Sequence, residues 1–191
     1  TEVKVGENVS KIGSYFFSYC SNLSTVNLGS NLEEIPSGTF SRCSALASVN
    51  IPQTVTEIGG CAFQDCKALS SISIPARVTK INSSAFHGCT NLKTFIIEDG
   101  DNELTMGDSF NSPFSDNCAI DSLYMGRNIS ISHYGKWTNL TKLTIGSKVT
   151  NLHGDYLFSS CKIITKIYPL WEQPITTSKS YFADAVYQNA T

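Results

Sequence analysis

One spacing constrains this chain more than any other feature: four of its cysteines each stand 23 residues from the next. Several apolar positions keep the same step. The repeating columns are Cys20, Cys43, Cys66 and Cys89; Phe17, Phe40, Phe63 and Phe86; Leu23, Leu46, Leu69 and Leu92; and Ile12, Ile35, Ile58 and Ile81. A period of about 20 to 50 residues is typical of solenoids, in which each unit buries its apolar side only by stacking on its neighbours.

Each unit contains a segment in which apolar and polar residues alternate, as in "LASVNI" (46–51) and "LSSISI" (69–74). This period of two predicts a short half-buried strand, and stacked units would pair such strands into a parallel sheet. The segment "GCAFQDC" (60–66) is too short for an independent helix and predicts a single helical or 3-10 turn. A second short extended segment follows Pro52 or Pro75, because proline marks a corner between two extended pieces.

The repeat divides the chain, which we take as a single domain over residues 1–191, into three parts. Regular units cover about 9–100, irregular units about 101–170, and a partial terminal unit 171–191. About five residues are inserted before Phe114, the next unit lacks about three, and the unit after that has one extra. Pro169 takes the last strand position, so we expect regular stacking to weaken there.

The cysteine column is better explained by packing than by chemistry. The seven cysteines include no C-x-x-C, and an odd count leaves one thiol over in any disulfide scheme. Because the column has the phase of the core columns, we interpret it as small buried residues rather than a metal or redox site. Distance alone does not exclude disulfides between the cysteines of neighbouring units. Cys61 differs, since Gly38 and Ser84 fill its column; it is either a reactive thiol or an inert, partly buried one.

No catalytic or metal-binding set emerges from the remaining polar residues. His87, His133 and His153 lie in three different columns, and no cysteine–histidine couple has a third group to orient it. The acidic run "EDGDNE" (98–103) offers calcium ligands but lacks the twelve-residue EF-hand spacing, which favours a solvated turn. We therefore predict no catalytic residues, no metal, no cofactor and no enzyme activity.

Charge and hydropathy exclude further classes of partner. Fourteen basic and sixteen acidic residues give a net charge of -2 without a basic run, which argues against nucleic acid. No apolar stretch approaches the roughly 20 residues of a membrane span, and no signal peptide opens the chain. Because Thr1 lies in a pattern already under way, we expect that an amino-terminal piece, with its signal or anchor, has been removed.

These columns resemble the leucine-rich repeat of the BspA type, a family named for a bacterial surface protein. The family unit reads L-x-x-I-x-I-P-x-x-V-x-x-I-x-x-x-A-F-x-x-C, and residues 46–66 read "LASVNIPQTVTEIGGCAFQDC". The resemblance covers about 9–167. It implies an α/β solenoid, a right-handed leucine-rich-repeat superhelix with a parallel sheet on the concave face and short helical or 3-10 turns and short extended segments on the other side. It also implies an extracellular or cell-surface protein of a host-associated bacterium, with adhesion as the activity of several members.

The outward positions of the strands are the predicted binding surface, because solenoids bind through an extended sheet. The first strands offer small hydroxyls and amides without the Trp, Tyr or Arg anchors of tight interfaces. Aromatic residues gather after residue 100, with Tyr124 at an outward strand position and Trp171 beyond the last unit. The candidates are Thr25, Asn27, Ser48, Asn50, Ser71, Ser73, Thr94, Ile96, Tyr124 and Trp171.

Two hypotheses for function follow. The first is a binding or adhesion module that presents a repeat scaffold to a host extracellular protein or a glycan. The second is a passive structural spacer with no ligand of its own.

Overall fold

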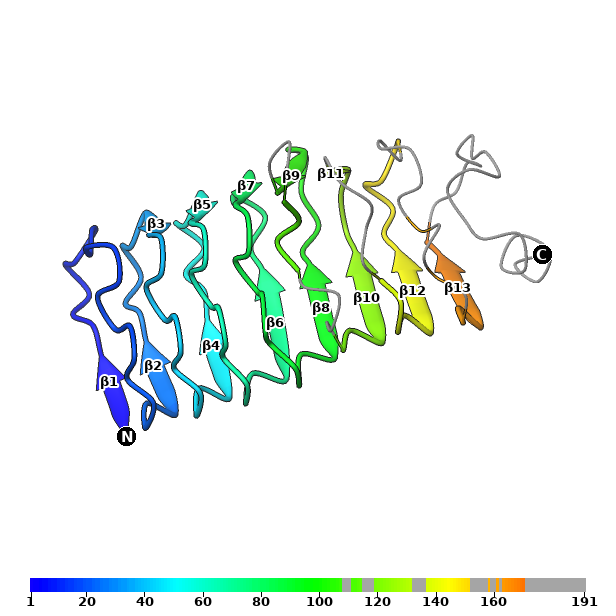
Figure 1. Ribbon diagram of the computed structural model, residues 1–191. Helices are drawn as coiled ribbons and strands as arrows, with labels where there is room; N and C mark the ends of the chain where they lie inside the picture. Colours follow the sequence, from blue (N-terminus) through cyan, green and yellow to red (C-terminus); the bar gives the residue numbers. More distant parts are fainter. Residues whose placement is uncertain are drawn as a thin grey trace.

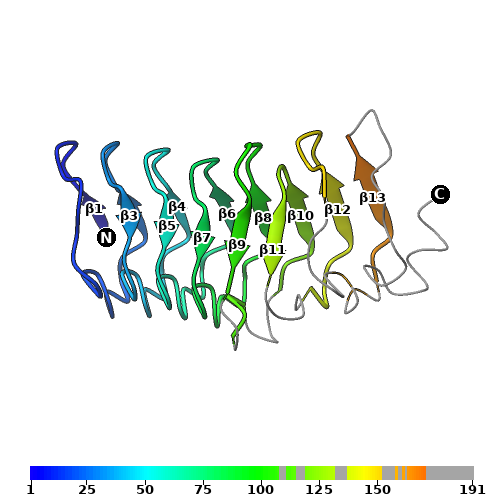
Figure 2. The same cartoon turned by 90° about the horizontal axis from the view of Figure 1, so that it is seen from above.

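The chain folds as a β-solenoid whose turns stack in sequence order (Figure 1). The computed structural model describes residues 1–107, 111–114, 119–131, 137–151, 158, 161 and 163–170. Each regular turn adds one strand to a long parallel sheet and one short strand to a second parallel sheet. In both rows the strands follow one another in chain order along the array (Figure 2). The prediction of stacked turns with a parallel sheet is therefore confirmed.

The strand bounds define the two sheets. The row that we call the long sheet consists of two parallel sheets in succession. The first contains β1 (Glu2–Lys4), β2 (Thr25–Asn27) and β4 (Ser48–Asn50), and the second contains β6 (Ser71–Ile74), β8 (Thr94–Ile97), β10 (Ser122–Met125), β12 (Lys142–Ile145) and β13 (Lys166–Pro169). Strand β4 contacts β6 without forming a hydrogen-bonded ladder with it. The short-strand sheet contains β3 (Glu34–Ile35), β5 (Glu57–Ile58), β7 (Lys80–Ile81), β9 (Leu104–Met106) and β11 (Ile129–Ile131).

The strand register reproduces the sequence period and its irregularities. Val26 pairs with Val49, one 23-residue step away. Phe95 pairs with Leu123, five residues beyond that step, and Leu123 pairs with Leu143, three residues short of it. Pairing does not break at Pro169, because this residue lies opposite Ile145 and the Leu170 amide donates to the Ile145 carbonyl at 2.8 Å.

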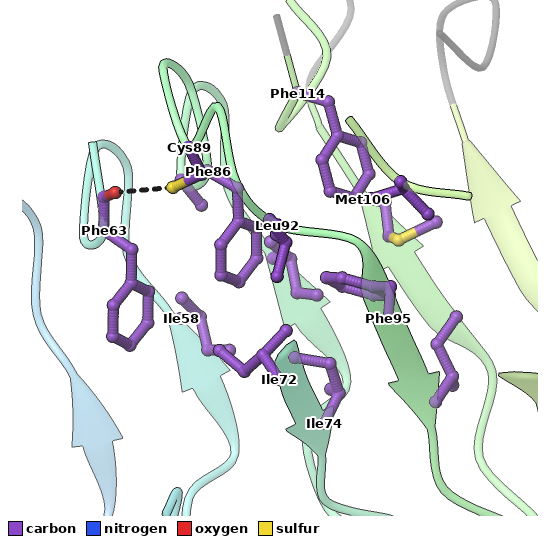
Figure 3. Packing of buried hydrophobic residues seen from close by; sticks show 14 of the residues in the cluster. Ile58, Phe63, Ile72, Ile74, Phe86, Cys89, Leu92, Phe95, Met106 and Phe114 are labelled. Carbon is purple, nitrogen blue, oxygen red and sulfur yellow. Dashed lines mark hydrogen bonds between the residues drawn. The ribbon is translucent and has the colours of Figure 1, made fainter. Parts of the chain in front are cut away.

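The predicted columns form the core, which runs the length of the described array. The phenylalanine rings stack from turn to turn, with centroids 5.5 Å apart for Phe17 and Phe40, 5.3 Å for Phe40 and Phe63, and 5.4 Å for Phe63 and Phe86. Such offset stacks add to the stabilisation that comes from burying apolar area. Phe114 continues the stack beyond the insertion, at 5.8 Å from Phe86 (Figure 3).

The segment between the sheets is not the helical or 3-10 turn that its length suggested, so this part of the predicted fold class is wrong. Two columns of residues adopt left-handed backbone: Tyr15, Gly38, Cys61 and Ser84 in the first, and Tyr19, Arg42, Asp65 and Gly88 in the second, with φ between 55° and 74°. A left-handed residue at every fourth position interrupts any helix.

Hydrogen bonds between turns replace the helical ones. The amides of Gly38, Phe40 and Arg42 donate to carbonyls of the next turn, at 2.7 to 2.9 Å. Alternate amides bond within the turn instead, as when the Ser41 amide donates to the Gly38 carbonyl at 2.9 Å. The described residues contain no helix, and hence none long and apolar enough to cross a membrane.

Candidate binding surface

The outward side chains of the long sheet form two columns that cross five strands from β2 to β10. The first column is Thr25, Ser48, Ser71, Thr94 and Ser122, and the second is Asn27, Asn50, Ser73, Ile96 and Tyr124. None of these ten positions carries a charge, and we call them the neutral face. Charged outward side chains stand on the flanking strands, with Glu2 and Lys4 on β1 and Lys142 on β12.

Nine of the ten residues predicted for binding thus share one face. The pattern of strand alternation accounts for this, because the residues between them, such as Val26, Ile72 and Phe95, point into the core. Ser122 completes the first column and was missed, although its place between Asp121 and Leu123 follows the same alternation. Trp171 lies outside the described residues.

The hydroxyls of the first column have no hydrogen-bond partner within the described parts of the chain. Hydroxyls elsewhere on the array are used differently: Thr54 donates to the Leu32 carbonyl at 2.7 Å, and Thr56 donates to the Glu33 carbonyl at 3.2 Å. Because a hydroxyl both donates and accepts, the first column offers a row of unused bonding groups to water or a ligand.

The second column ends in a fixed aromatic residue. The Tyr124 hydroxyl donates to Asp99 Oδ1 at 2.8 Å, and Ile96 lies beside Tyr124 in the strand register. Desolvation, followed by the bond to the Asp99 carboxylate, raises the pKa of Tyr124 above its usual range. The ring therefore remains a neutral phenol at physiological pH, held at one edge of the neutral face.

The acidic run beside this face is bonded to the protein rather than simply solvated. We call Glu98, Asp99 and Asp101 the acidic corner. Glu98 accepts hydrogen bonds from Ser73 at 2.7 Å and from Gln53 at 3.0 Å, and Asp101 pairs with Lys148 at 2.9 Å. Among the described residues no group of His, Cys, Asp and Glu has the arrangement of a metal site. The carboxylates thus serve as acceptors for neighbouring turns.

Several links at this corner skip one turn and join turns two steps apart. Gln53 reaches Glu98 across the corner that holds Pro75 and Ala76. In the opposite direction, the Arg127 guanidinium donates to the carbonyls of Pro75, at 2.8 Å, and Ala76. Two-turn links of this kind tie successive corners together.

Arg127 is fully buried, which the sequence did not signal. Burial lowers the pKa of its guanidinium, and the nearby Glu98 carboxylate opposes this shift. Gly100 makes room for the side chain, since a Cβ there would stand 3.2 Å from Arg127 Cδ. The equivalent places of the two preceding turns hold Asp99 and Ala76, so a search for repeated residues cannot find Arg127.

A shallow polar groove of about 400 Å³ opens where β2 and β4 end. Its polar lining includes Asn27 and Asn50 of the neutral face together with Glu7 and Gln53. Asn27 Oδ1 accepts from the Gly29 amide at 3.1 Å, which orients that side chain. The groove therefore extends the neutral face toward the acidic corner.

The cysteine column packs in the core and also donates hydrogen bonds. Cys43 and Cys66 are fully buried and their thiols donate to the Phe17 and Phe40 carbonyls of the preceding turn, at 3.0 and 3.2 Å. Burial raises the pKa of Cys43 to about 11 and raises the pKa of Cys66 further. None of the six described cysteines forms a disulfide.

The other candidate chemical groups stay apart. Cys61 is intermediate in exposure, which fits the interpretation as a partly buried thiol. Its backbone adopts the left-handed conformation of its turn. His87 is exposed, whereas His133, His153 and Cys118 lie outside the described residues.

The first turn carries an exposed aromatic group that the sequence analysis did not single out. Tyr15, Phe16 and Tyr19 are 59%, 62% and 67% exposed, and the Arg42 guanidinium lies 5.0 Å from the Tyr19 ring centroid. Phe16 occupies the column in which later turns have Thr39, Ala62 and Ala85. This departure from small residues was the available signal.

Comparison with known proteins identifies the repeat. Residues 1–112 and 109–186 match the family model described as the BspA type leucine-rich repeat region, in six copies. No curated protein sequence matches the chain significantly.

Three solved structures are similar. A leucine-rich repeat protein from Bacteroides ovatus has 29% identity over 85% of this chain, with a TM-score of 0.65, and the chain spans 42% of that protein. The T. pallidum leucine-rich repeat protein has 21% identity over 85% of the chain, which spans 77% of that protein, with a TM-score of 0.66. A leucine-rich cell surface protein from Faecalibacterium prausnitzii has 17% identity over 97% of the chain, which spans 64% of that protein, with a TM-score of 0.40.

Proposed function

Because the chain belongs to the BspA-type leucine-rich repeat family, we propose that it is an extracellular or cell-surface binding module that presents a repeat scaffold to a host protein or a glycan. The observation that carries this proposal is the neutral face, on which ten outward positions cross five parallel strands without a charge. Extended sheet faces of this kind are the usual binding surfaces of solenoids.

The chemistry of the surface supports binding rather than catalysis. The hydroxyls of its first column have no hydrogen-bond partner among the described residues, its amides border an open groove, and Tyr124 is fixed by Asp99. The buried thiols carry raised pKa values, which makes the reactive thiolate scarce at neutral pH. Attachment to a cell surface and adhesion to a host are parts of the same proposal, supported by the family.

A passive spacer is the second candidate, and the bonds between turns favour it. Stacked rings and thiol–carbonyl bonds join neighbouring turns along the described array, and the two-turn links at the acidic corner join turns two steps apart. Such a rod would hold another domain at a distance without any ligand of its own. The two candidates differ in one respect: only a binding module depends on the side chains of the neutral face.

Binding to immobilised matrix proteins and to a glycan array tests the proposal. The wild-type chain is compared with a Ser48→Lys/Ser71→Lys variant, which places two cations on the neutral face, and with Thr105→Lys, which changes an exposed position of β9 in the other sheet. We expect capture that the double variant loses and the Thr105 variant keeps. No capture on either platform, or equal capture by all three chains, would favour the spacer.

A further inference from the structure

The neutral face is the strongest indication of what kind of ligand the protein takes. Its five first-column hydroxyls repeat once per strand, and neighbouring strands lie about 4.8 Å apart, so the row is roughly 20 Å long. That distance per strand is close to the length of one sugar residue in an extended polysaccharide. A linear chain of sugars lying along the array would meet a hydroxyl and a second polar or apolar side chain at every step.

We propose that the neutral face binds an uncharged, extended glycan whose chain runs from β2 to β10. This inference rests on the proposed binding function and narrows it to one class of ligand. Hydroxyls and amides are matched to sugar hydroxyls because both partners donate and accept, so bonds form without a charge on either side.

Charge on and around the face agrees with a neutral ligand. The ten positions contain no cation that could pair with sulfate or uronate groups, and the adjacent edge carries Glu98 and Asp99. An anionic polysaccharide would therefore meet repulsion from this edge, and the cations Lys4 and Lys142 stand only on the flanking strands β1 and β12. The acidic corner does not disturb a neutral chain, since Glu98 and Asp99 already accept hydrogen bonds from Ser73 and Tyr124.

The apolar part of the site lies at its β8–β10 end. Ile96 and Tyr124 are neighbours in the register and both are partly exposed. The C–H face of a sugar ring packs on an aromatic ring in the way other apolar surfaces do. Because Asp99 fixes the Tyr124 hydroxyl, little side-chain freedom is lost when a sugar stacks there.

A protein ligand is less well matched. Tight protein interfaces depend on buried Trp, Tyr and Arg anchors, and Tyr124 is the single residue of these types on the face. The other outward side chains are too small to fill a pocket in a folded partner. They do suit a ligand that is itself an array of hydroxyls.

Calorimetric titration with three hexasaccharides tests the inference: cellohexaose, which is neutral and extended; maltohexaose, which is neutral and coiled; and hexagalacturonate, which is anionic. We expect cellohexaose to bind best and hexagalacturonate least. Raising the salt from about 50 to 500 mM should leave cellohexaose binding nearly unchanged, because no ion pair is involved.

The variants locate the site. Ser48→Lys/Ser71→Lys should weaken cellohexaose binding about tenfold or more, and Tyr124→Ala should also weaken it, whereas Thr105→Lys should bind as the wild type does. Thermal melts establish that each variant is folded. Tighter binding of hexagalacturonate, or cellohexaose binding that the double variant retains, would overturn the inference.

Failure of the glycan inference can be told from failure of the binding function. If no hexasaccharide binds but a matrix protein is captured and the double variant loses it, the ligand is a protein and only the inference falls. If neither hexasaccharides nor matrix proteins bind, the inference and the proposed function fall together.

Discussion

The Cys66 thiol lies 3.2 Å from the Phe40 carbonyl oxygen of the preceding turn and donates a hydrogen bond to it. The same bond joins Cys43 to Phe17 at 3.0 Å. It also joins Cys89 to Phe63 at 3.0 Å (Figure 3). The column therefore does more than fill space with a small apolar group. Each thiol adds a bond from the next turn to a carbonyl that already accepts an amide within its own turn, as the Phe40 carbonyl does from the Cys43 amide at 3.0 Å.

Replacing the thiol separates these two roles. Cys66→Ala removes both the donor and part of the packed volume, and we expect the free energy of unfolding to fall by about 1 to 3 kcal/mol. Cys66→Ser keeps a donor of similar size and should be about 0.5 to 1.5 kcal/mol more stable than Cys66→Ala. Urea denaturation under reducing conditions measures both. Equal stability of the two variants would mean that the column acts by packing alone, and Cys20→Ala, at an exposed thiol, is the control.

The raised pKa values of the thiols make stability depend on alkaline pH. Below the ordinary thiol pKa, folded and unfolded chains are both protonated and the thiols contribute no pH dependence. Above it the unfolded chain loses protons that folded Cys66 retains, so stability falls as pH rises. Between about pH 7.5 and 9.5 we expect a loss of about 1 kcal/mol per buried thiol. Denaturation at the two pH values should show a smaller difference for Cys66→Ala than for the wild type.

An unchanged pH difference in Cys66→Ala would show that this thiol ionises as readily in the folded chain as in the unfolded one. Cys43, whose pKa is raised to about 11, provides a second test of the same sign. Cys20→Ala is again the matched control, because its thiol is exposed.

The left-handed turn positions predict opposite effects for two substitutions in one column. Cys61 has φ of 55°, a conformation that costs a non-glycine residue about 1 kcal/mol, so Cys61→Gly should cost little stability or raise it. Gly38→Ala should destabilise, since a Cβ at Gly38 would stand 2.2 Å from the Tyr15 ring. Thermal melts compare the two. A stabilising effect of Gly38→Ala would contradict the backbone assigned to this turn.

The sequence predicted those features that every turn repeats. The core columns, the parallel register and the shifts around Phe95, Leu123 and Leu143 follow from apolar residues that must stay in phase. The left-handed turn was missed because only Gly38 and Gly88 are of the residue type that favours positive φ. The other residues of the two columns, such as Arg42, are rare in that conformation.

The candidate binding surface was also predicted only in part. Strand alternation placed its residues on one face, because side chains along a strand point to opposite sides in turn. The acidic run is mostly exposed, as a solvated turn predicts, but its hydrogen bonds were not foreseen because the partners come from other turns: Gln53 stands 45 residues before Glu98, and Lys148 stands 47 residues after Asp101. A contact that occurs once, between residues far apart in the sequence, produces no repeated pattern from which it could be predicted.

Two basic residues near the acidic corner should differ widely in their contribution to stability. Arg127 is buried and bonds two carbonyls, so Arg127→Ala should lower the free energy of unfolding by about 2 to 4 kcal/mol through lost packing and two lost hydrogen bonds from a charged group. Lys148 and Asp101 form an exposed pair, and Lys148→Ala should leave the free energy of unfolding nearly unchanged. Urea denaturation measures both variants. Similar effects would place the Arg127 side chain in solvent rather than beneath Gly100.

The phenylalanine stack gives the sharpest test of the register. Phe63 is fully buried between Phe40 and Phe86, so Phe63→Ala should cost about 3 to 5 kcal/mol. Phe17, at the first turn, is only partly buried, and Phe17→Ala should cost less because part of its ring already meets water. Ser71→Ala, on the neutral face, should lie within about 0.5 kcal/mol of the wild type. A thermal and urea series that found the same small effect for all three would show that the stack does not hold the array together.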